Sequence, residues 1–261
     1  MLRLMNEKRL FAALLTVIGV LLLASVASAQ WLNHPSTGIP RTADGRPNLS
    51  ARAPRTSGGK PDLSGVWRPD FRYFGDLAVD GVKVPFQPWA EALFNERQAN
   101  NRKDHPRARC LPIGMPQMVA SPFPVKMIQT SDVLVILYEA ENTFRQIFLD
   151  GRKVPPDPQP TWRGYSVGHW DGDDLVVEIT GFNGESWLDY AGHPQTDALH
   201  LTERFSRLDF GHMRIQITID DRKAYTMPWA VTEEYLFLPD ADLLEEVCLE
   251  NEKDAPHMVG K

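Results

Sequence analysis

Residues 212–219 alternate strictly between polar and apolar side chains, and no other feature of the sequence restricts the fold as strongly. A β-strand turns successive side chains to opposite faces of its sheet, so the alternation predicts a strand with one buried face. The preceding run, 199–208, is joined to it through Asp209-Phe210-Gly211 and is expected to be its antiparallel partner. The face predicted to be buried is formed by Met213, Ile215, Ile217 and Ile219.

Most of the chain from residue 125 onward has the same character of short strands joined by turns. Residues 133–138 form a continuous apolar run, which predicts a strand buried on both faces. Asp171-Gly172-Asp173 separates two strand-like runs, and Asp-Gly at such a position is a strong hairpin signal. Further strands are expected at 63–67, 143–149 and 235–238, whereas residues 242–250 fit either a strand or a helix.

One helix is expected near 88–102, because Pro88 suits the first helical position and Trp89 and Leu93 mark one face. Sequential hairpins with a single helical excursion predict a mainly β fold. We expect an antiparallel meander that closes into a calycin-like barrel, since such a sheet must hide its edges. A two-sheet β-sandwich is the alternative.

The N-terminus has the three parts of a secretory signal peptide in residues 1–29. Three basic residues precede an apolar run from Leu10 to Val26, and Ala27-Ser28-Ala29 follows it. An uncleaved membrane anchor is the alternative, but the small residues at the end of the run favour cleavage. We therefore expect a periplasmic or secreted protein with no stable membrane insertion after cleavage.

The remaining chain divides into three parts by composition. Residues 30–62 are rich in Pro, Gly, Ser and Thr and are expected to form a linker or surface strap with two similar turns, at 44–50 and 58–64. Residues 63–251 are expected to form a single β-rich domain. Residues 252–261 are expected to form a C-terminal tail.

The charge balance and the cysteines restrict the partners. Residues 1–29 contain three basic and one acidic side chain, which leaves 25 basic and 33 acidic ones and a net charge of −8. This excess of acid disfavours nucleic acid as a partner. Cys110 and Cys248 are expected to form one disulfide in an oxidising compartment. The sequence has no CxxC or HExxH motif and no phosphate-binding glycine loop, so we expect no metal and no cofactor.

Three strings carry a resemblance to a known family. They lie at 145–152 (RQIFLDGR), 160–178 and 199–205 (LHLTERF). The chain resembles a large family of uncharacterised secreted bacterial proteins with the motifs R-x-I-x-L-D-G-R and G-x-W-x-G-D-x-L-V-V-[DE]. That resemblance implies export and supplies no catalytic residue. Gly65-Val66-Trp67 also resembles the G-x-W opening of lipocalin barrels.

Glu203 is the residue that points most directly to function. In the predicted strand it shares a face with Leu199, Leu201 and Phe205. A carboxylate among apolar neighbours is costly unless it is paired or neutral. The residue pattern favours a structural ion pair of Glu203, for example with Arg145 or Arg204, and the alternative is a carboxyl group that contacts a ligand or acts as a general acid or base.

A loop and several aromatic residues complete the candidate site. Residues 187–194 combine Trp187, Asp189, Tyr190 and His193, a composition that suits the rim of a binding site. His193 could also cap the loop before Pro194. Aromatic residues at 162–187 are expected either in the core or in a wall that contacts a ligand. The predicted ligand contacts are Arg145, Trp162, Tyr165, Trp187 and Tyr190.

Three functions follow from these residues. The first is an exported protein that binds a small, largely apolar molecule in a barrel cavity. The second is an acid–base enzyme (a hydrolase, isomerase or lyase) that uses Glu203 as a catalytic residue with His193 or Asp189. The third is an assembly module that binds partners through residues 30–62. The sequence leaves the oligomeric state open.

Overall fold

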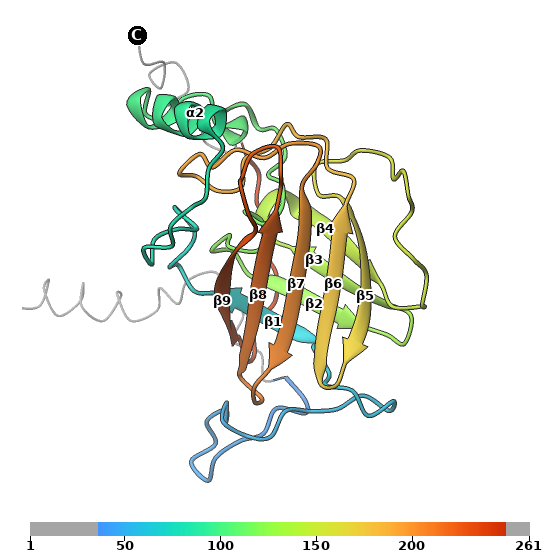
Figure 1. Ribbon diagram of the computed structural model, residues 1–261. Helices are drawn as coiled ribbons and strands as arrows, with labels where there is room; N and C mark the ends of the chain where they lie inside the picture. Colours follow the sequence, from blue (N-terminus) through green and yellow to red (C-terminus); the bar gives the residue numbers. More distant parts are fainter. Residues whose placement is uncertain (1–35, 249–261) are drawn as a thin grey trace, which may run out of the picture.

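Nine β-strands form a closed barrel within residues 36–248, the part of the chain that the computed structural model describes (Figure 1). Each strand pairs with the next one along the chain, and β9 pairs with β1. The predicted barrel is therefore confirmed, and the β-sandwich is not formed. The strands are β1 (Gly65–Pro69), β2 (Val125–Gln129), β3 (Val133–Tyr138), β4 (Thr143–Phe148), β5 (Tyr165–Asp171), β6 (Asp174–Thr180), β7 (His200–Arg207), β8 (His212–Asp220) and β9 (Trp229–Phe237).

The barrel departs at one point from a purely antiparallel meander. Strands β4 and β5 run parallel and pair only at Ile147 with Ser166 and at Phe148 with Val167. The chain between them, 149–164, contains four prolines and carries the backbone back to the end of the barrel where β4 began. Proline cannot donate to a strand ladder, so this connection does not join the sheet, and β5 starts beside β4 in the same direction.

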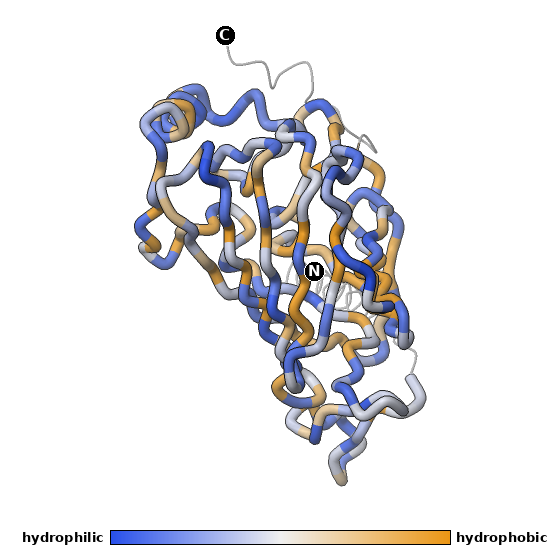
Figure 2. The backbone as a smooth tube through the Cα atoms, turned by 45° about the vertical axis from the view of Figure 1, so that its right-hand side comes forward, coloured by the Kyte–Doolittle hydropathy of each residue, from blue (hydrophilic) through white to orange (hydrophobic). Residues whose placement is uncertain are grey.

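Alternation of side chains fills the barrel as the sequence predicts. Strand β8 buries Met213, Ile215, Ile217 and Ile219. Strand β7 buries Leu201, Glu203, Phe205 and Arg207. Figure 2 shows hydrophobic and hydrophilic segments alternating along the strands. The prediction for 133–138 was wrong in one respect: Leu134, Ile136 and Tyr138 are buried, but the residues between them are only half-buried. An apolar run is compatible with one buried face, because periodicity alone does not show what covers the other face.

Several boundaries differ from expectation. The helix, α2 (Pro88–Ala99), ends three residues early, where Asn101 and Arg102 have φ near +58° and +57°. Strand β9 begins at Trp229 and not at Tyr235. Residues 241–248 form neither strand nor helix. Two short 3-10 turns, η1 (Pro106–Arg109) and η2 (Ala140–Asn142), complete the regular structure.

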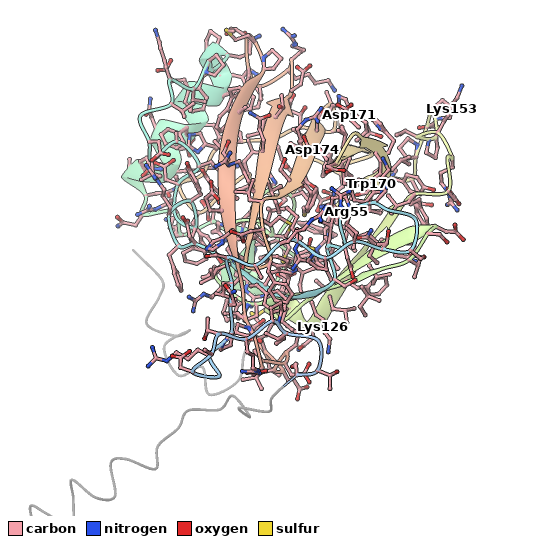
Figure 3. The ribbon with its side chains drawn as sticks, turned by 90° about the horizontal axis from the view of Figure 1, so that it is seen from below. Arg55, Lys126, Lys153, Trp170, Asp171 and Asp174 are labelled. Atoms are coloured by element: carbon pink, nitrogen blue, oxygen red, sulfur yellow. A yellow bond between two sulfur atoms is a disulfide. The ribbon has the colours of Figure 1, made fainter. Side chains whose placement is uncertain are left out.

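The strap closes the lower end of the barrel with two equivalent turns. In each turn an arginine donates to the carbonyl oxygen four residues later: Arg41 to Gly45 and Arg55 to Gly59. Arg41 also pairs with Asp240 (2.9 Å), and Arg55 pairs with Asp173 in the β5–β6 turn. Figure 3 shows Arg55 beside Trp170 at this end.

The middle of the strap is fixed between these two ion pairs. Leu49 lies so close to Gly211 that a Cβ on the glycine would be 2.5 Å from the Leu49 Cβ. The Leu49 carbonyl also accepts from the Gly211 N–H (2.7 Å), and the Ala51 carbonyl accepts from the Phe210 N–H (2.8 Å). The strap therefore lies against the β7–β8 turn as a fixed part of the fold.

The upper end is covered by α2 and the β6–β7 loop (Figure 1). Arg97 and Gln98 on α2 donate to the carbonyl oxygens of Gly192 and Ala191. The predicted disulfide between Cys110 and Cys248 is present, with Cα atoms 6.0 Å apart. Both ends of the barrel are thus occupied by the chain itself, which leaves the wall as the place for an opening.

The sequence expectations for residues 1–35 and 249–261, the signal peptide and the C-terminal tail among them, lie outside the described residues. None of the helices within residues 36–248 has the length and hydrophobicity needed to span a bilayer.

Candidate functional site

A pocket of about 340 Å³ opens in the barrel wall at the seam between β4 and β5. It lies here because the two strands pair over only two residues, so the wall above that pairing is not closed by a ladder. Small-molecule sites are typically concave and largely apolar, with a few convergent polar groups, and their volumes begin near 300 Å³. The pocket is lined by Phe144, Arg145, Gln146, Phe148, Thr161, Trp162, Arg163, Gly164, Tyr165 and Ser166.

Arg145 forms the polar floor of the pocket. It points inward from β4 and is buried together with Glu203 of β7. Its Nη1 donates to Glu203 Oε2 (2.8 Å), and its Nε donates to Ser166 Oγ (3.0 Å). The remaining nitrogen, Nη2, and the other carboxylate oxygen, Glu203 Oε1, make no well-formed hydrogen bond within residues 36–248, although the Tyr138 phenol interacts with the guanidinium. A buried donor and a buried acceptor thus lie behind the pocket, whose lining includes Arg145 but not Glu203.

The electrostatics of the floor follow from burial. Burial raises the pKa of the Glu203 carboxyl, and the adjacent Arg145 guanidinium opposes that rise. Burial also raises the pKa of the neighbouring Tyr138 phenol, which therefore stays protonated at neutral pH. Glu203 accordingly has Arg145 as its ion-pair partner, one of the two arginines considered from sequence. Arg204 points outward, to Asp171 and Asp174 (3.0 Å each).

The outer wall of the pocket is aromatic. The rings of Phe148 and Tyr165 stack across the seam, with centroids 5.3 Å apart. Arg152 lies over the Phe148 ring (3.8 Å to its centroid) and donates to Tyr165 Oη (3.0 Å). Phe144 is 60% exposed, so an apolar surface faces solvent at the opening.

Two of these wall residues were missed by the sequence reasoning. Phe144 and Phe148 alternate along β4 with the buried Arg145 and Ile147. Period-two alternation could therefore have assigned both phenylalanines to the outer face. Their proximity to Trp162 depends on the parallel pairing of β4 and β5, which the sequence did not reveal.

The other predicted site residues form a separate cluster at the upper end of the barrel. Asp189 is fully buried and accepts from the backbone N–H groups of Leu77, Gly192 and His193. Its Oδ2 lies 2.6 Å from His193 Nδ1. The imidazole of His193 stacks on Phe86 and on Phe94, with centroid distances of 5.5 and 4.6 Å, and the two phenylalanine rings also contact each other (5.4 Å). Asp189 therefore holds the β6–β7 loop closed over the barrel.

Trp187 and Tyr190 belong to this upper cluster as well. Both contact the buried His105, which stacks on the Tyr190 ring at 4.4 Å and meets the Trp187 ring edge-on at 4.8 Å. Burial lowers the pKa of His105 to about 4, so its ring is neutral at pH 7. Asp76, Asp189 and His193 offer three ligand-type atoms within 4.8 Å of one another, but the Asp189 oxygens are already engaged by the loop.

The structure thus divides the predicted site in two. Arg145, Trp162 and Tyr165 line the seam pocket, with Glu203 behind them. Asp189, His193, Trp187 and Tyr190 lie under α2 and the β6–β7 loop. Among the described residues, no hydrogen bond or ion pair joins Glu203 to His193 or Asp189.

Comparison with known proteins adds little to this geometry. No protein-family model matches the chain, and no curated protein matches it. Among solved structures, a mutant of the fluorescent protein UnaG is similar, with 14% sequence identity. That similarity covers 67% of this chain and 96% of the other, at a TM-score of 0.31. A likeness at this level carries no argument about a ligand.

Proposed function

We propose that this protein is an exported binding protein that holds a small molecule at the seam between β4 and β5. The ligand has a flat, largely apolar body that lies on the aromatic wall and a hydrogen-bond acceptor that reaches Arg145. The unpaired Nη2 of Arg145, buried at the floor of an aromatic pocket, is the observation that carries the proposal.

The energetics favour an occupant at this floor. A buried donor without a partner costs about 1–3 kcal/mol, more when it belongs to a charged group. Natural proteins have few such atoms, and each one calls for an explanation such as a ligand or ordered water. Arg145 and Glu203 are neutral as a pair, so the floor suits a neutral acceptor at Nη2, such as a carbonyl or hydroxyl oxygen, whereas an ionised carboxylate would bring an uncompensated negative charge next to Glu203.

Export is part of the proposal for two reasons. Residues 1–29 have the order of a signal peptide, and Cys110 and Cys248 are joined in a disulfide. A periplasmic or secreted location accommodates both.

Binding is favoured over acid–base catalysis by the partners of the titratable groups. An enzyme that used Glu203 with His193 or Asp189 would need these groups to converge on one substrate. Here Glu203 is engaged by Arg145, and Asp189 is engaged by its own loop.

The proposal is tested with Nile red, a planar, apolar and neutral fluorescent probe that carries a carbonyl oxygen. We expect saturable, one-to-one binding to the wild-type protein, read as a rise in probe fluorescence. Trp162→Ala removes part of the wall and should weaken binding at least about tenfold. The double variant Arg145→Met with Glu203→Met removes the anchor without stranding a charge and should weaken it similarly.

Trp89→Ala is the matched control, because Trp89 is a half-exposed tryptophan on α2, away from the seam. It should leave the probe affinity unchanged. The proposal fails if the wild-type protein does not bind the probe saturably, or if neither seam variant changes the affinity.

A further inference from the structure

Glu233 is a buried acid, and no hydrogen bond or ion pair within residues 36–248 accounts for its burial. It points inward from β9, between Val231 and Tyr235, and its side chain has no exposure to solvent. Neither of its carboxyl oxygens has a hydrogen-bond partner within residues 36–248. Glu203, the other acid buried on an inward strand face, has Arg145 beside it, whereas Glu233 has no ion pair in the described part of the chain.

The barrel wall beside Glu233 is not closed by a strand. Strand β1 pairs with β9 only at residues 235–237, and the last backbone bond of this seam runs from Asp70 N to Glu234 O (2.9 Å). Residues 71–77 then continue without strand pairing, held at their far end by the bond from Leu77 N to Asp189 Oδ2 (2.9 Å). A short irregular segment that includes Tyr73 thus continues from β1 where strand pairing with β9 ends.

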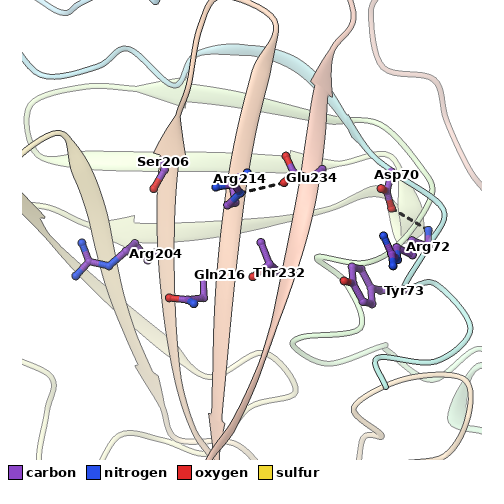
Figure 4. A pocket seen from close by; sticks show the side chains of 9 residues that line it. All are labelled: Asp70, Arg72, Tyr73, Arg204, Ser206, Arg214, Gln216, Thr232 and Glu234. Carbon is purple, nitrogen blue, oxygen red and sulfur yellow. Dashed lines mark hydrogen bonds and ion pairs between the residues drawn. The ribbon is translucent and has the colours of Figure 1, made fainter. Parts of the chain in front are cut away.

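A hollow of about 520 Å³ lies on the outer side of the same segment (Figure 4). Tyr73, Asp70, Thr232 and Glu234 line it, together with residues of β7 and β8. Tyr73 is only 7% exposed, and the charge of Glu233 contributes to the raised pKa of its phenol, behind burial and the contact with Asp80. Tyr73 thus lines the hollow and lies near enough to Glu233 for the carboxyl to act on its phenol, which makes it the residue whose movement would connect the two.

The protonation state of Glu233 follows from its surroundings. Burial raises its pKa to about 9, and the nearby carboxylates of Asp70 and Glu234 add to the rise. The phenols of Tyr73 and Tyr235 are the other titratable groups whose pKa values respond to it. At neutral pH the group is a carboxylic acid, which presents an O–H donor beside a carbonyl acceptor.

We propose that Glu233 is the anchor of a second binding site, reached by displacement of Tyr73, for a neutral ligand that carries an amide group. The amide oxygen accepts from the carboxyl O–H, and the amide N–H donates to the other carboxyl oxygen. Both unpartnered oxygens are then satisfied by one ligand group. An anionic ligand is disfavoured, because the Asp70 and Glu234 carboxylates lie near Glu233. The arginines that line the outer hollow, Arg72, Arg204 and Arg214, are paired with Asp80, Asp174 and Glu234.

The test uses three probes that share one ring and differ in the attached group: benzamide, benzoate and benzylammonium. Ligand-observed NMR titration of the whole exported protein should show saturable benzamide binding and much weaker binding of the two charged probes. Glu233→Met keeps the side-chain length and removes both hydrogen bonds, so benzamide affinity should fall at least about tenfold. Glu233→Gln again offers a donor beside an acceptor and should retain affinity within about threefold.

Two further readouts separate this site from the seam pocket and from misfolding. The Arg145→Met with Glu203→Met variant should bind benzamide as the wild-type protein does. The proposal for the seam pocket and the proposal for Glu233 are therefore tested separately. Thermal unfolding should show that Glu233→Met is folded. The infrared band of the buried protonated carboxyl should be absent from Glu233→Gln and should shift in the wild-type protein when benzamide is added.

Three results overturn the proposal: no saturable benzamide binding, benzamide affinity unchanged in Glu233→Met, or tighter binding of benzylammonium with affinity that rises with pH. The last result would assign the site to an organic cation that pairs with ionised Glu233.

Discussion

Replacing Glu233 by glutamine should stabilise the protein, and the gain should grow with pH. The carboxyl ionises near pH 4.5 in the unfolded chain and near pH 9 in the folded one. Between these values the unfolded state releases a proton that the folded state retains, so the contribution of Glu233 to stability is complete below pH 4.5 and is lost as pH rises toward 9. Glutamine has nearly the same shape and carries no ionisable proton.

The magnitude follows from the two ionisation points. Each pH unit between them costs the wild-type protein about 1.4 kcal/mol. At pH 7 the loss is about 3 kcal/mol, which is a large part of the total stability of about 5–15 kcal/mol usual for a domain. Glu233→Gln should therefore be similar to the wild-type protein near pH 4.5 and about 3 kcal/mol more stable at pH 7.

The assay is denaturant unfolding followed by tryptophan fluorescence at pH 5, 6, 7 and 8. The control is Glu91→Gln, because Glu91 is an exposed glutamate in the first turn of α2 and is not among the charges that act on Glu233. Its effect should stay small and nearly constant over this range. A difference between wild type and Glu233→Gln that does not change with pH would refute the reasoning, since burial of an ionisable group cannot produce it.

Three other changes test the structure. Glu203→Gln should cost about 3–5 kcal/mol of unfolding free energy by stranding Arg145, and the added change Arg145→Met should recover most of it; a loss that persists in the double variant would contradict the ion pair. Reduction of the disulfide between Cys110 and Cys248 should lower stability by about 2–4 kcal/mol, and thiol labelling of denatured, unreduced protein should find no reactive thiol. Gly211→Ala should cost about 1–3 kcal/mol by pushing the strap off the β7–β8 turn and should speed proteolysis within residues 36–62; unchanged proteolysis would argue against a docked strap.

The barrel could be predicted from the sequence because the signals for it come from residues that are close together in the chain. The alternation at 212–219 requires a sheet with one covered face, and repeated hairpins require closure. The inward direction of Glu203 followed from the same alternation. That rule could also have excluded Arg204 as the partner of Glu203, because neighbours on a strand point to opposite faces.

The sequence could not show which loops lie close to which strands in the folded barrel. Grouping His193 with Glu203 was reasonable from their spacing of ten residues, but the β6–β7 loop carries His193 under α2, away from the barrel interior. Glu233 escaped notice because the polar pair Glu233-Glu234 hid the alternation of Trp229, Val231, Tyr235 and Phe237 on one face of β9. A buried acid within a run of polar residues can be identified only when it is known which face of the strand points into the barrel.

The shortest strand pairings in the barrel wall are β4–β5, with two residue pairs, and those on the two sides of β1, with three pairs each to β2 and to β9. The other pairings are longer, and strands β5–β9 form a continuous antiparallel meander. Because β5–β9 is built only from neighbours in sequence, it can form early in folding, whereas the join of β1 to β9 spans about 170 residues and closes a long loop at high entropic cost. Local opening should follow the lengths of these pairings, with amide protons at β4–β5 and on both sides of β1 exchanging faster than those of β8. The wall should therefore open most readily at the β4–β5 seam and around β1, the two regions beside which the proposed ligands bind.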